Sequence, residues 1–344
     1  MRKLSLVLLV LLLVCCFGGC GSAYKEIYAM DTVITLEVWG EGAEDALMVL
    51  QKFLNQTEQK LSVTRTSSII SRLNAGQTVT LDEETEVLLE EALALCAATD
   101  GALDIGLYPV SRLWGFTTGD YGVPTAEELE TAMAVSGWEK LTLADGQVTM
   151  TPGGMIDLGA VTKGWAGRQC VAYLGQHTGV TGAMLVLGGN VQTYGTKADG
   201  SPWKVGIQNP TGSGLAGVLC LEGSWAIVTS GGYQRFFRED GKIYSHILDG
   251  TTGCPAESGL QSVTIVSADG LLADGLSTAL YVMGLEEAVA FWRERQDFEA
   301  VFIDDGGQVF VTEGLRENLT DCAAAVIWRQ RDPVPTAHGT SPGG

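Results

Sequence analysis

The sequence is poor in positive charge. It has 21 Lys+Arg against 41 Asp+Glu, which gives a formal net charge of −20 over 344 residues. Binding to a nucleic-acid backbone depends on clustered lysine and arginine side chains, so this balance argues against a nucleic-acid partner. An anionic ligand would need a local source of positive charge, because the overall field of the protein repels it.

Long hydrophobic runs are lacking after the N-terminus. Residues 4–17 are almost wholly apolar and follow Arg2 and Lys3, which is typical of a secretory signal peptide. A helix of that length spans about 21 Å, short of the ~30 Å hydrocarbon core of a bilayer. The run ends in Gly18-Gly19-Cys20, which resembles the cleavage box of bacterial lipoproteins. The alternative is an ordinary signal peptide with an incidental cysteine.

This N-terminal pattern predicts where the mature protein starts and where it resides. We predict a signal peptide over residues 1–19, lipidation of Cys20, and a linker over residues 20–27. One domain follows over residues 28–330, and a flexible tail over residues 331–344. The expected location is the extracytoplasmic face of a bacterial cell membrane, in the periplasm or on the cell surface.

The cysteines show no CxxC pair. Of the eight, five follow Cys20, and they are widely spaced. An odd number without metal-ligand spacing makes both a disulfide framework and a zinc site unexpected. We predict that most of these cysteines are small core residues.

Strand-like and helix-like segments are mixed without strict alternation. Residues 32–38 and several short runs within residues 183–267 have the composition of strands. Apolar residues recur at helical spacing over residues 42–60, and Asp82 and Thr125 are placed to cap two further helices. The mixture favours an α+β fold over a doubly wound parallel sheet. Also predicted are helices over residues 161–175, 270–283 and 285–296, a strand over residues 243–247, and a hairpin over residues 299–311.

The segment Met155–Ala166 places an aspartate, a Gly-Ala turn and then Lys163 at the start of a predicted helix. Free backbone N–H groups and a lysine at such a position attract phosphate. The segment lacks the GxxxxGK[ST] pattern of a Walker A loop. A capped helix with a surface lysine is the alternative.

Asp274 and Thr278 lie four residues apart on a predicted helix, so their oxygens share one face. Mg²⁺ takes oxygen ligands and uses few protein groups, because water and substrate phosphates complete its octahedron. An aspartate favoured by the helix dipole and a threonine bonded back to its own helix are the alternative.

His246 is one of only three histidines, and it ends a predicted strand beside a glycine-rich turn. An imidazole there is able to act as a base near neutral pH, although a structural histidine is the alternative. Two further glycine-rich segments, Gly188-Gly189-Asn190 and Thr229-Ser230-Gly231, allow the backbone to approach a ligand closely.

The order of these motifs resembles the ApbE family, the FAD:protein FMN transferases. The resemblance covers about residues 28–312. Its first half includes Met30-Asp31-Thr32-Val33 and Gly101–Gly106, and its second half runs from Asp157 through the His246 segment to Thr278.

The resemblance implies a two-lobed α+β fold with mixed or antiparallel sheets, flanking helices and a flavin cleft between the lobes. It implies Mg²⁺-dependent cleavage of FAD, transfer of FMN through a phosphoester to a threonine or serine of a target protein, and release of AMP. An FAD pyrophosphatase and a non-catalytic FAD-binding lipoprotein are the alternatives.

The resemblance also implies the roles of individual residues. His246 would be the catalytic base, and Asp274, Thr278 and the backbone carbonyl of Ala160 would hold the metal. The residues that would bind FAD are Met30, Ala102, Leu103, Asp104, Asp157, Lys163 and Ile247.

The chain departs from the family pattern at three points. The turn after His246 reads Asp249-Gly250-Thr251-Thr252-Gly253, where the family usually has Asp-Pro-Arg-Thr-Gly. Thr64 stands where the family often has an aromatic residue. The family's acceptor motif is Ser/Thr-Gly-Ala-Ser/Thr, and Thr181-Gly182-Ala183-Met184 lacks its last hydroxyl residue. We therefore expect the acceptor to be another protein.

Overall fold

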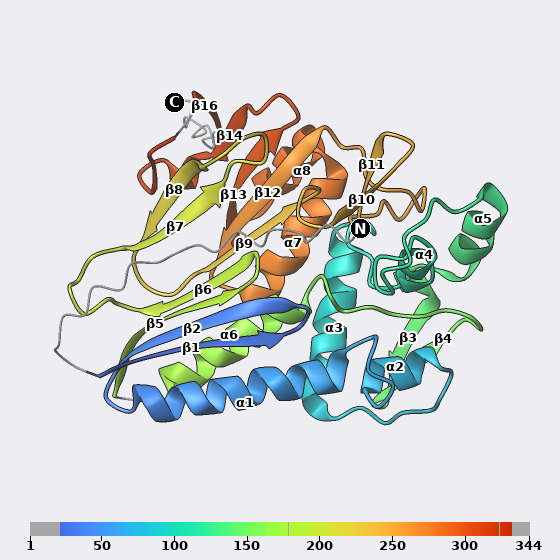
Figure 1. The fold of residues 1–344 in the computed structure, drawn as a ribbon, viewed down its shortest axis with the longest axis horizontal. Coiled ribbons are helices and arrows are strands. Elements are labelled where there is room, and N and C mark those ends of the chain that lie inside the picture. The colour runs from blue at the N-terminus through green and yellow to red at the C-terminus, as the bar shows by residue number, and fades with distance from the viewer. Residues whose placement is uncertain (1–20, 178, 323, 332–344) are drawn as a thin grey trace, which may run out of the picture.

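A nine-stranded sheet forms the centre of the molecule in the computed structural model, which describes residues 21–177, 179–322 and 324–331 (Figure 1). Eight of its strands pair antiparallel, and the last, β16, pairs parallel with β14. In spatial order the strands are β1 (Ser22–Ala29), β2 (Thr32–Gly40), β5 (Val180–Leu187), β6 (Asn190–Gly195), β9 (Ala226–Gly231), β12 (Leu260–Ser267), β13 (Phe298–Asp304), β14 (Val309–Thr312) and β16 (Val326–Arg329).

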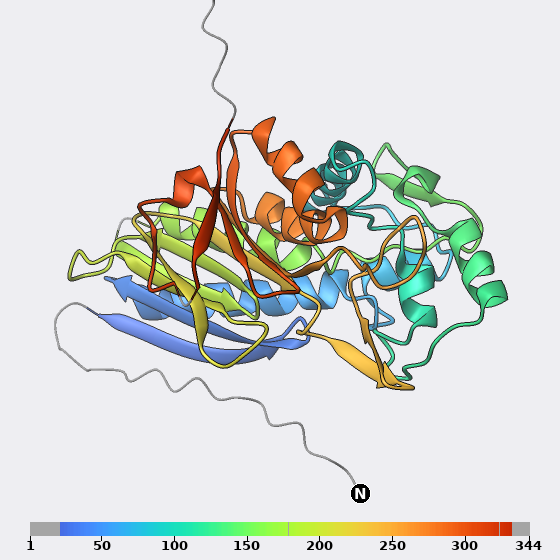
Figure 2. The ribbon, with the colours of Figure 1, turned by 90° about the horizontal axis from the view of Figure 1, so that it is seen from above.

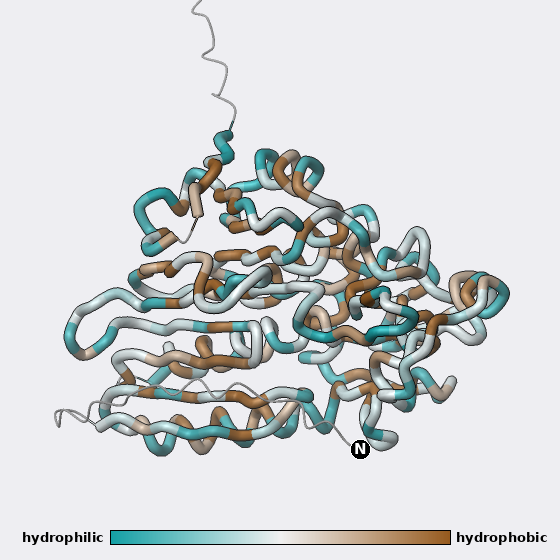
Figure 3. Tube along the Cα trace, turned by 45° about the horizontal axis from the view of Figure 1, so that its top comes forward, coloured by the Kyte–Doolittle hydropathy of each residue, from teal (hydrophilic) through white to brown (hydrophobic). Residues whose placement is uncertain are grey.

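Helices cover one face of this sheet. The largest hydrophobic cluster lies between the sheet and these helices, and Figure 3 shows its hydrophobic positions along the strands and helices. Because apolar residues of α1 recur at helical spacing, Leu47, Leu50 and Leu54 reach this core. The covering helices are α1 (Ala43–Leu61), α6 (Thr162–Gly175), α7 (Gly270–Met283) and α8 (Leu285–Arg293), with α3 (Glu83–Ala98) packed against α7.

A second layer covers part of the other face. A three-stranded sheet of β15 (Leu319–Thr320), β8 (Leu215–Leu221) and β7 (Trp203–Gln208) packs there, and Ile207 and Leu219 meet Val266 and Val301 of the central sheet. The central strand β12 is therefore buried on both faces and has no alternation of polar and apolar residues.

The remaining elements form a smaller region beside the sheet, and the hairpin of β10 and β11 projects next to it (Figure 2). An aromatic cluster that includes Trp114, Phe116 and Phe237 joins the hairpin to α4 and α5. These elements are α2 (Ile69–Asn74), α4 (Tyr108–Leu113), α5 (Ala126–Val135), β3 (Leu141–Ala144), β4 (Gln147–Met150), β10 (Phe236–Glu239) and β11 (Lys242–Ser245); short 3₁₀ turns lie at Trp138–Lys140 and Glu313–Leu315.

The structure confirms the α+β class and both predicted caps. The Asp82 side chain accepts from the Thr85 backbone N–H at 2.9 Å, and Thr125 forms a complete capping box with Glu128. The prediction that most of the later cysteines are core residues is wrong, because only Cys96 and Cys170 are buried, whereas Cys220, Cys254 and Cys322 are partly exposed.

The predicted N-terminal linker is wrong over most of its length. Residues 22–27 belong to β1, which pairs with β2 from Ser22 opposite Trp39 to Ala29 opposite Thr32. The buried positions Ala23 and Ala29 have low intrinsic strand propensity, and Lys25 and Glu26 lie between them. Pairing with β2 stabilises this strand, so its composition did not reveal it. The predicted tail, apart from Arg331, lies outside the described residues.

No helix in the described parts of the chain is both long and apolar enough to cross a bilayer. Residues 1–20, which include Cys20 and the predicted signal peptide, lie outside the described residues.

Candidate active site

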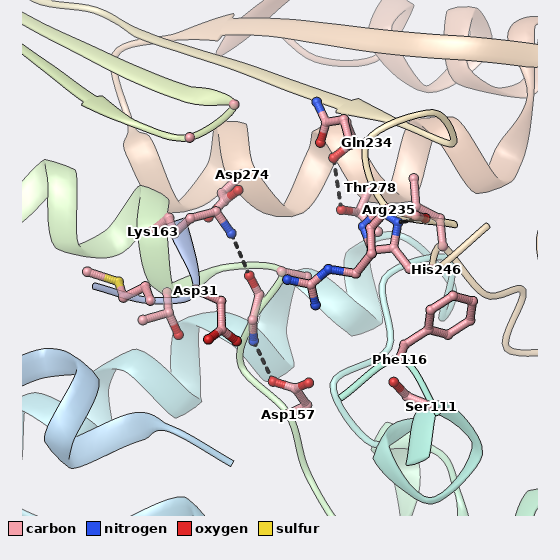
Figure 4. A pocket seen from close by; sticks show the side chains of 18 of the residues that line it. Asp31, Ser111, Phe116, Asp157, Lys163, Gln234, Arg235, His246, Asp274 and Thr278 are labelled. Atoms are coloured by element: carbon pink, nitrogen blue, oxygen red, sulfur yellow. Dashed lines mark hydrogen bonds between the residues drawn. The ribbon is translucent and has the colours of Figure 1, made fainter. Parts of the chain in front are cut away.

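One cavity of about 940 Å³ brings together segments that lie far apart in the sequence (Figure 4). It lies where the β1–β2 turn, the start of α6, the end of β9, the loop after β11 and one face of α7 meet. All eleven residues predicted for catalysis, FAD binding and metal binding line it: Met30, Ala102, Leu103, Asp104, Asp157, Ala160, Lys163, His246, Ile247, Asp274 and Thr278. The structure therefore places them together, while their individual roles stay predictions.

Asp274 is a buried carboxylate at the cavity wall, only 5% exposed. Its Oδ2 accepts a hydrogen bond of 2.7 Å from the backbone N–H of Gly164 in α6. Burial raises the pKa of the Asp274 carboxyl, because its charge is poorly solvated. A cation at this position would offset that cost.

The carbonyl of Ala160 lacks a hydrogen-bond partner among the described residues. Its regular partner would be the N–H of Gly164, four residues on, but that N–H donates to Asp274 instead. Ala160 and Thr278 both line the cavity together with Asp274. One carboxylate, one free carbonyl and one hydroxyl form an oxygen donor set that fits Mg²⁺, with substrate phosphates and water as further ligands.

A metal held mainly by protein side chains is not indicated. Residues 21–177, 179–322 and 324–331 contain no group of three or more His, Cys, Asp or Glu side chains arranged to hold an ion. The donor set above has a single carboxylate, so a divalent ion there would depend on the ligand's own oxygens.

Glycines allow α6 and α7 to approach closely enough for this geometry. A Cβ atom on Gly164 would lie 2.5 Å from the Cβ of Asp274 and would also collide with the backbone of Gly270. Any larger residue at position 164 would separate the two helices. The close approach is what allows the Gly164 N–H to bond to the Asp274 carboxylate.

His246 follows the last residue of β11, so the strand ends one residue before it, two residues earlier than predicted. Its Nδ1 lies 3.0 Å from the Arg235 carbonyl oxygen, which also accepts from the His246 backbone N–H at 3.1 Å. A carbonyl only accepts, so Nδ1 carries the proton and Nε2 keeps a free lone pair. Burial, reinforced by the charge of Arg235, lowers the pKa of His246 to about 4. The imidazole is therefore neutral at pH 7 and able to accept a proton.

Two further carboxylates hold loops at the cavity in place. Asp157 accepts from the Gly159 N–H at 2.8 Å, and Asp104 accepts from the Gly106 N–H at 2.7 Å. Burial raises the pKa of both groups, that of Asp104 to about 6 with a contribution from nearby Glu139. Lys163 donates to the Gly159 carbonyl oxygen at 3.1 Å, which holds its ammonium group at the cavity.

The β1–β2 turn explains why Met30 reaches the site. Met30 and Asp31 have φ values of 51° and 57°, as a two-residue hairpin turn with left-handed backbone requires. Non-glycine residues rarely adopt this conformation, so the tight turn is a feature that the pairing of β1 with β2 imposes. It places both residues in the cavity wall.

The glycine-rich segments are part of the same cavity. Gly188, Gly189, Asn190, Thr229 and Ser230 all line it, which confirms that these segments approach a ligand-sized space. Thr64, which stands where the family often has an aromatic residue, also lines it. The turn after His246 closes without an arginine, because Asp249 accepts hydrogen bonds from the backbone N–H and hydroxyl of Thr251.

Several cavity residues were missed by the sequence analysis. Arg235, Gln234, Asp31, Ser111 and Phe116 line the cavity without belonging to a predicted site (Figure 4). Arg235 had one available signal, since it is one of few cations in an acidic chain and follows a glycine-rich strand end. Phe116 lies with its ring edge-on to His246, at 6.4 Å between ring centroids.

Comparison with known proteins agrees with this geometry. The sequence model of the ApbE family matches residues 30–302. The chain is 32% identical over 280 residues to the FAD:protein FMN transferase of Vibrio cholerae, covering 79% of this chain and 84% of that protein. It is 32% identical over 294 residues to the FAD:protein FMN transferase of Treponema pallidum, covering 80% and 81%.

Solved structures of similar proteins have the same fold. The ApbE protein of Thermotoga maritima superposes with a TM-score of 0.81 at 31% identity, covering 87% of this chain and 99% of that one. The flavin transferase ApbE of Vibrio cholerae superposes with a TM-score of 0.78 at 29% identity, covering 87% and 100%. From the family match and these relatives, the chain belongs to the ApbE family.

Proposed function

We propose that this protein is a Mg²⁺-dependent FAD:protein FMN transferase. The observation that carries the proposal is the convergence of all eleven predicted residues, from segments 30 to 278, on one cavity of about 940 Å³. That volume is of the size of a cofactor site. Several curated relatives of the chain bear the name FAD:protein FMN transferase, which supports the same reaction.

Asp274, Thr278 and the Ala160 carbonyl would hold the magnesium ion. When bound, the ion neutralises charge on the linking phosphates of FAD and so lowers the barrier to breaking that bond. Lys163 adds a second positive charge at the start of α6, where a phosphate is favoured. In a chain with a net charge of −20, local cations of this kind are necessary for binding a diphosphate.

His246 acts as the base in this proposal. The free Nε2 takes the proton from the acceptor hydroxyl as its oxygen attacks the phosphorus of the FMN half. The bond to the AMP phosphate oxygen breaks, and AMP leaves with that electron pair. Because phosphoryl transfer needs positioning and charge neutralisation more than covalent help, the remaining residues orient FAD.

The acceptor is a threonine or serine of another protein, within a motif of the Ser/Thr-Gly-Ala-Ser/Thr type. The related segment of this chain, residues 181–184, lies inside β5 and pairs with β2 and β6. Because this segment is held by strands on both sides, it could enter the cavity of the same chain or of a second copy only if the sheet unfolded. We further propose that Cys20 is lipidated and holds the enzyme on the extracytoplasmic face of the cell membrane.

The function is tested by incubating the protein with FAD, Mg²⁺ and an acceptor domain that carries the motif. We expect the acceptor mass to rise by one FMN phosphoester and AMP to appear in equal amount. An acceptor whose motif hydroxyl residue is replaced by valine is the matched control and should stay unmodified. An unchanged wild-type acceptor, with the enzyme folded, would refute the transferase.

The same assay separates the two alternatives. A pyrophosphatase would release FMN and AMP equally fast without acceptor, because water would replace the hydroxyl. A binding protein would retain intact FAD after Mg²⁺ is added. His246→Ala should slow transfer far more than it weakens FAD binding, since the imidazole acts in the reaction step.

A further inference from the structure

The charges around the cavity are unbalanced. Only Lys163 and Arg235 among its lining residues carry permanent positive charge. Lys163 lies on the side near Asp274, where its ammonium donates one hydrogen bond to the Gly159 carbonyl oxygen. The side near His246 has Arg235 as its cation. The carboxylates that line the same cavity are Asp31, Glu58, Asp104, Asp157 and Asp274.

Arg235 enters the cavity from the segment between β9 and β10. Figure 4 shows its side chain extending from the side of His246 toward the loop that carries Asp157. Its charge adds to the burial that lowers the pKa of His246 and partly opposes the burial that raises the pKa of Asp157, so the guanidinium is within electrostatic reach of each. Within the described parts of the chain its guanidinium makes no hydrogen bond or ion pair, whereas Arg65, Arg168 and Arg295 are all paired with carboxylates.

The same residue also fixes the base. The Arg235 backbone carbonyl accepts from both Nδ1 and the backbone N–H of His246. Arg235 therefore supplies both the backbone acceptor that orients His246 and a cationic side chain that lines the same cavity.

We propose that Arg235 is a catalytic residue that binds the phosphoryl group of the FMN half of FAD while that group is transferred. This inference rests on the proposed transferase function. The acceptor oxygen bonds to the phosphorus, the bond to AMP breaks with its electron pair, and the proton moves to Nε2 of His246. The guanidinium pairs with two non-bridging oxygens of the transferred group, a geometry that its planar fork matches.

Removing this guanidinium should therefore reduce turnover more than substrate binding. Arg235→Gln keeps the backbone carbonyl that orients His246 and removes the guanidinium with its charge and its fork of donors. We expect kcat to fall on the order of 10²–10³-fold, as for loss of one preorganised donor at a transition state. Arg235→Lys should recover part of the loss, because it restores the charge without the fork.

Arg238→Gln is the matched control. Arg238 lies three residues further along in β10, is exposed, stacks on Phe236 at 5.6 Å, and lies outside the cavity. The Arg238→Gln substitution removes one positive charge from a neighbouring position, and we expect the kcat of this variant to lie within twofold of the wild-type value. Added guanidinium ion should raise the rate of Arg235→Ala and leave Arg238→Ala unchanged, which a purely structural role would not produce.

Two results would overturn the inference. One is an Arg235→Gln enzyme whose kcat equals that of Arg238→Gln. The other is a loss confined to the KM for FAD with no rescue by guanidinium, which would make Arg235 a ground-state binding residue. If the wild-type enzyme itself transfers no FMN, the proposed function fails instead, so the two failures are distinguishable.

Discussion

His246 illustrates how a single residue is prepared by its neighbours. The Arg235 carbonyl fixes its tautomer, and burial lowers its pKa to about 4. A base with this pKa is deprotonated over the whole physiological range, although it accepts protons less strongly than an unperturbed histidine. The His246 imidazole is therefore a weaker base, but its protonation state stays constant over this pH range.

This gives a prediction for the pH dependence of kcat/KM. The base works when deprotonated, so activity is lost as pH falls through the folded pKa of about 4. We expect His246 to contribute no fall between about pH 5.5 and 8, whereas an unperturbed histidine would contribute one near 6.5. The carboxyl of Asp104, with a pKa raised to about 6, titrates within the same range and is told apart by its persistence in the His246 variant. AMP release measured across this range checks it. His246→Gln should lose about 10²–10⁴-fold in rate and lack the limb near pH 4; a wild-type limb centred near 6.5 that His246→Gln lacks would contradict the prediction.

Asp274→Asn tests the buried carboxylate. Asparagine keeps an oxygen that accepts from Gly164 but has no charge to hold a cation. We expect Mg²⁺ to raise the unfolding temperature of the wild type and leave this variant unchanged. Because burial raises the pKa of Asp274, its ionised carboxylate destabilises the metal-free folded state at pH values above that pKa. Without metal, the free energy of unfolding of Asp274→Asn at pH 7–8 should therefore be no lower than that of the wild type.

The control for this measurement is Asp199→Asn, which removes an exposed charge whose hydrogen bonds stay within its own loop. Its response to Mg²⁺ should match that of the wild type. A Mg²⁺-dependent shift that survives in Asp274→Asn would contradict the assignment of this residue as a metal ligand.

Some site residues were predictable because their signal is local. Lys163 begins a helix beside an aspartate, and Asp274 and Thr278 share a helical face; both facts follow from spacing alone. Arg235 has no such signature, because its importance depends on a hairpin that carries it next to His246. The carbonyl of Ala160 was named only through the family resemblance, because its lack of a partner results from Gly164 bonding across to another helix.

The packing of α6 against α7 brings the residues with these local signals together in one site. Gly164 and Gly270 meet where the two helices cross, and neither has room for a Cβ atom. This close approach allows the hydrogen bond from the Gly164 backbone N–H to the Asp274 carboxylate. A glycine within a helix costs about 1 kcal/mol relative to alanine, and here the contact requires it.

Gly164→Ala should therefore reduce stability and disturb the proposed metal site. The new methyl group would collide with Gly270 and Asp274, and we expect a loss of about 1–3 kcal/mol in the free energy of unfolding. Mg²⁺ affinity should also fall, because Asp274 is displaced. Chemical denaturation and Mg²⁺ titration of the metal-free protein measure the two effects.

Gly175→Ala is the control, at the last residue of the same helix. A Cβ there would meet only Tyr194 at an ordinary 3.8 Å, so stability should be unchanged or slightly higher. If Gly164→Ala behaved in the same way, the close packing of the two helices would be unnecessary for the site.

Among the elements, strands with β-branched residues were predictable and β1 was not. Thr32, Val33 and Ile34 mark β2 by a run of β-branched residues, whereas β1 has a single β-branched residue, Ile27, among serine, alanine, tyrosine, lysine and glutamate, and depends on its partner. The order of the strands in the sheet was also not predictable from the sequence. The neighbours β6 and β9 are separated by 30 residues that form a different sheet.

At the scale of the whole molecule, β1 leads from the start of the described residues to the cavity. The strand starts at Ser22, two residues after Cys20, and its other end leads directly into Met30 and Asp31. Eight residues of strand span about 26 Å. A lipid on Cys20 would therefore hold the sheet edge close to the bilayer, with the cavity about one strand length away from the attachment point.

Cys20→Ser separates anchoring from chemistry. We expect the variant to move from the membrane fraction to the soluble fraction and to lose incorporation of labelled palmitate, because no thiol remains for the lipid. Its rate with a soluble acceptor should equal that of the wild type in detergent, since the attachment point lies a strand length from the cavity. Fractionation measures the loss of membrane association, and AMP release measures the reaction rate. Ser22→Ala is the control, because it keeps the Cys20 thiol. Membrane association that persists in Cys20→Ser would show that something other than this lipid holds the protein at the bilayer.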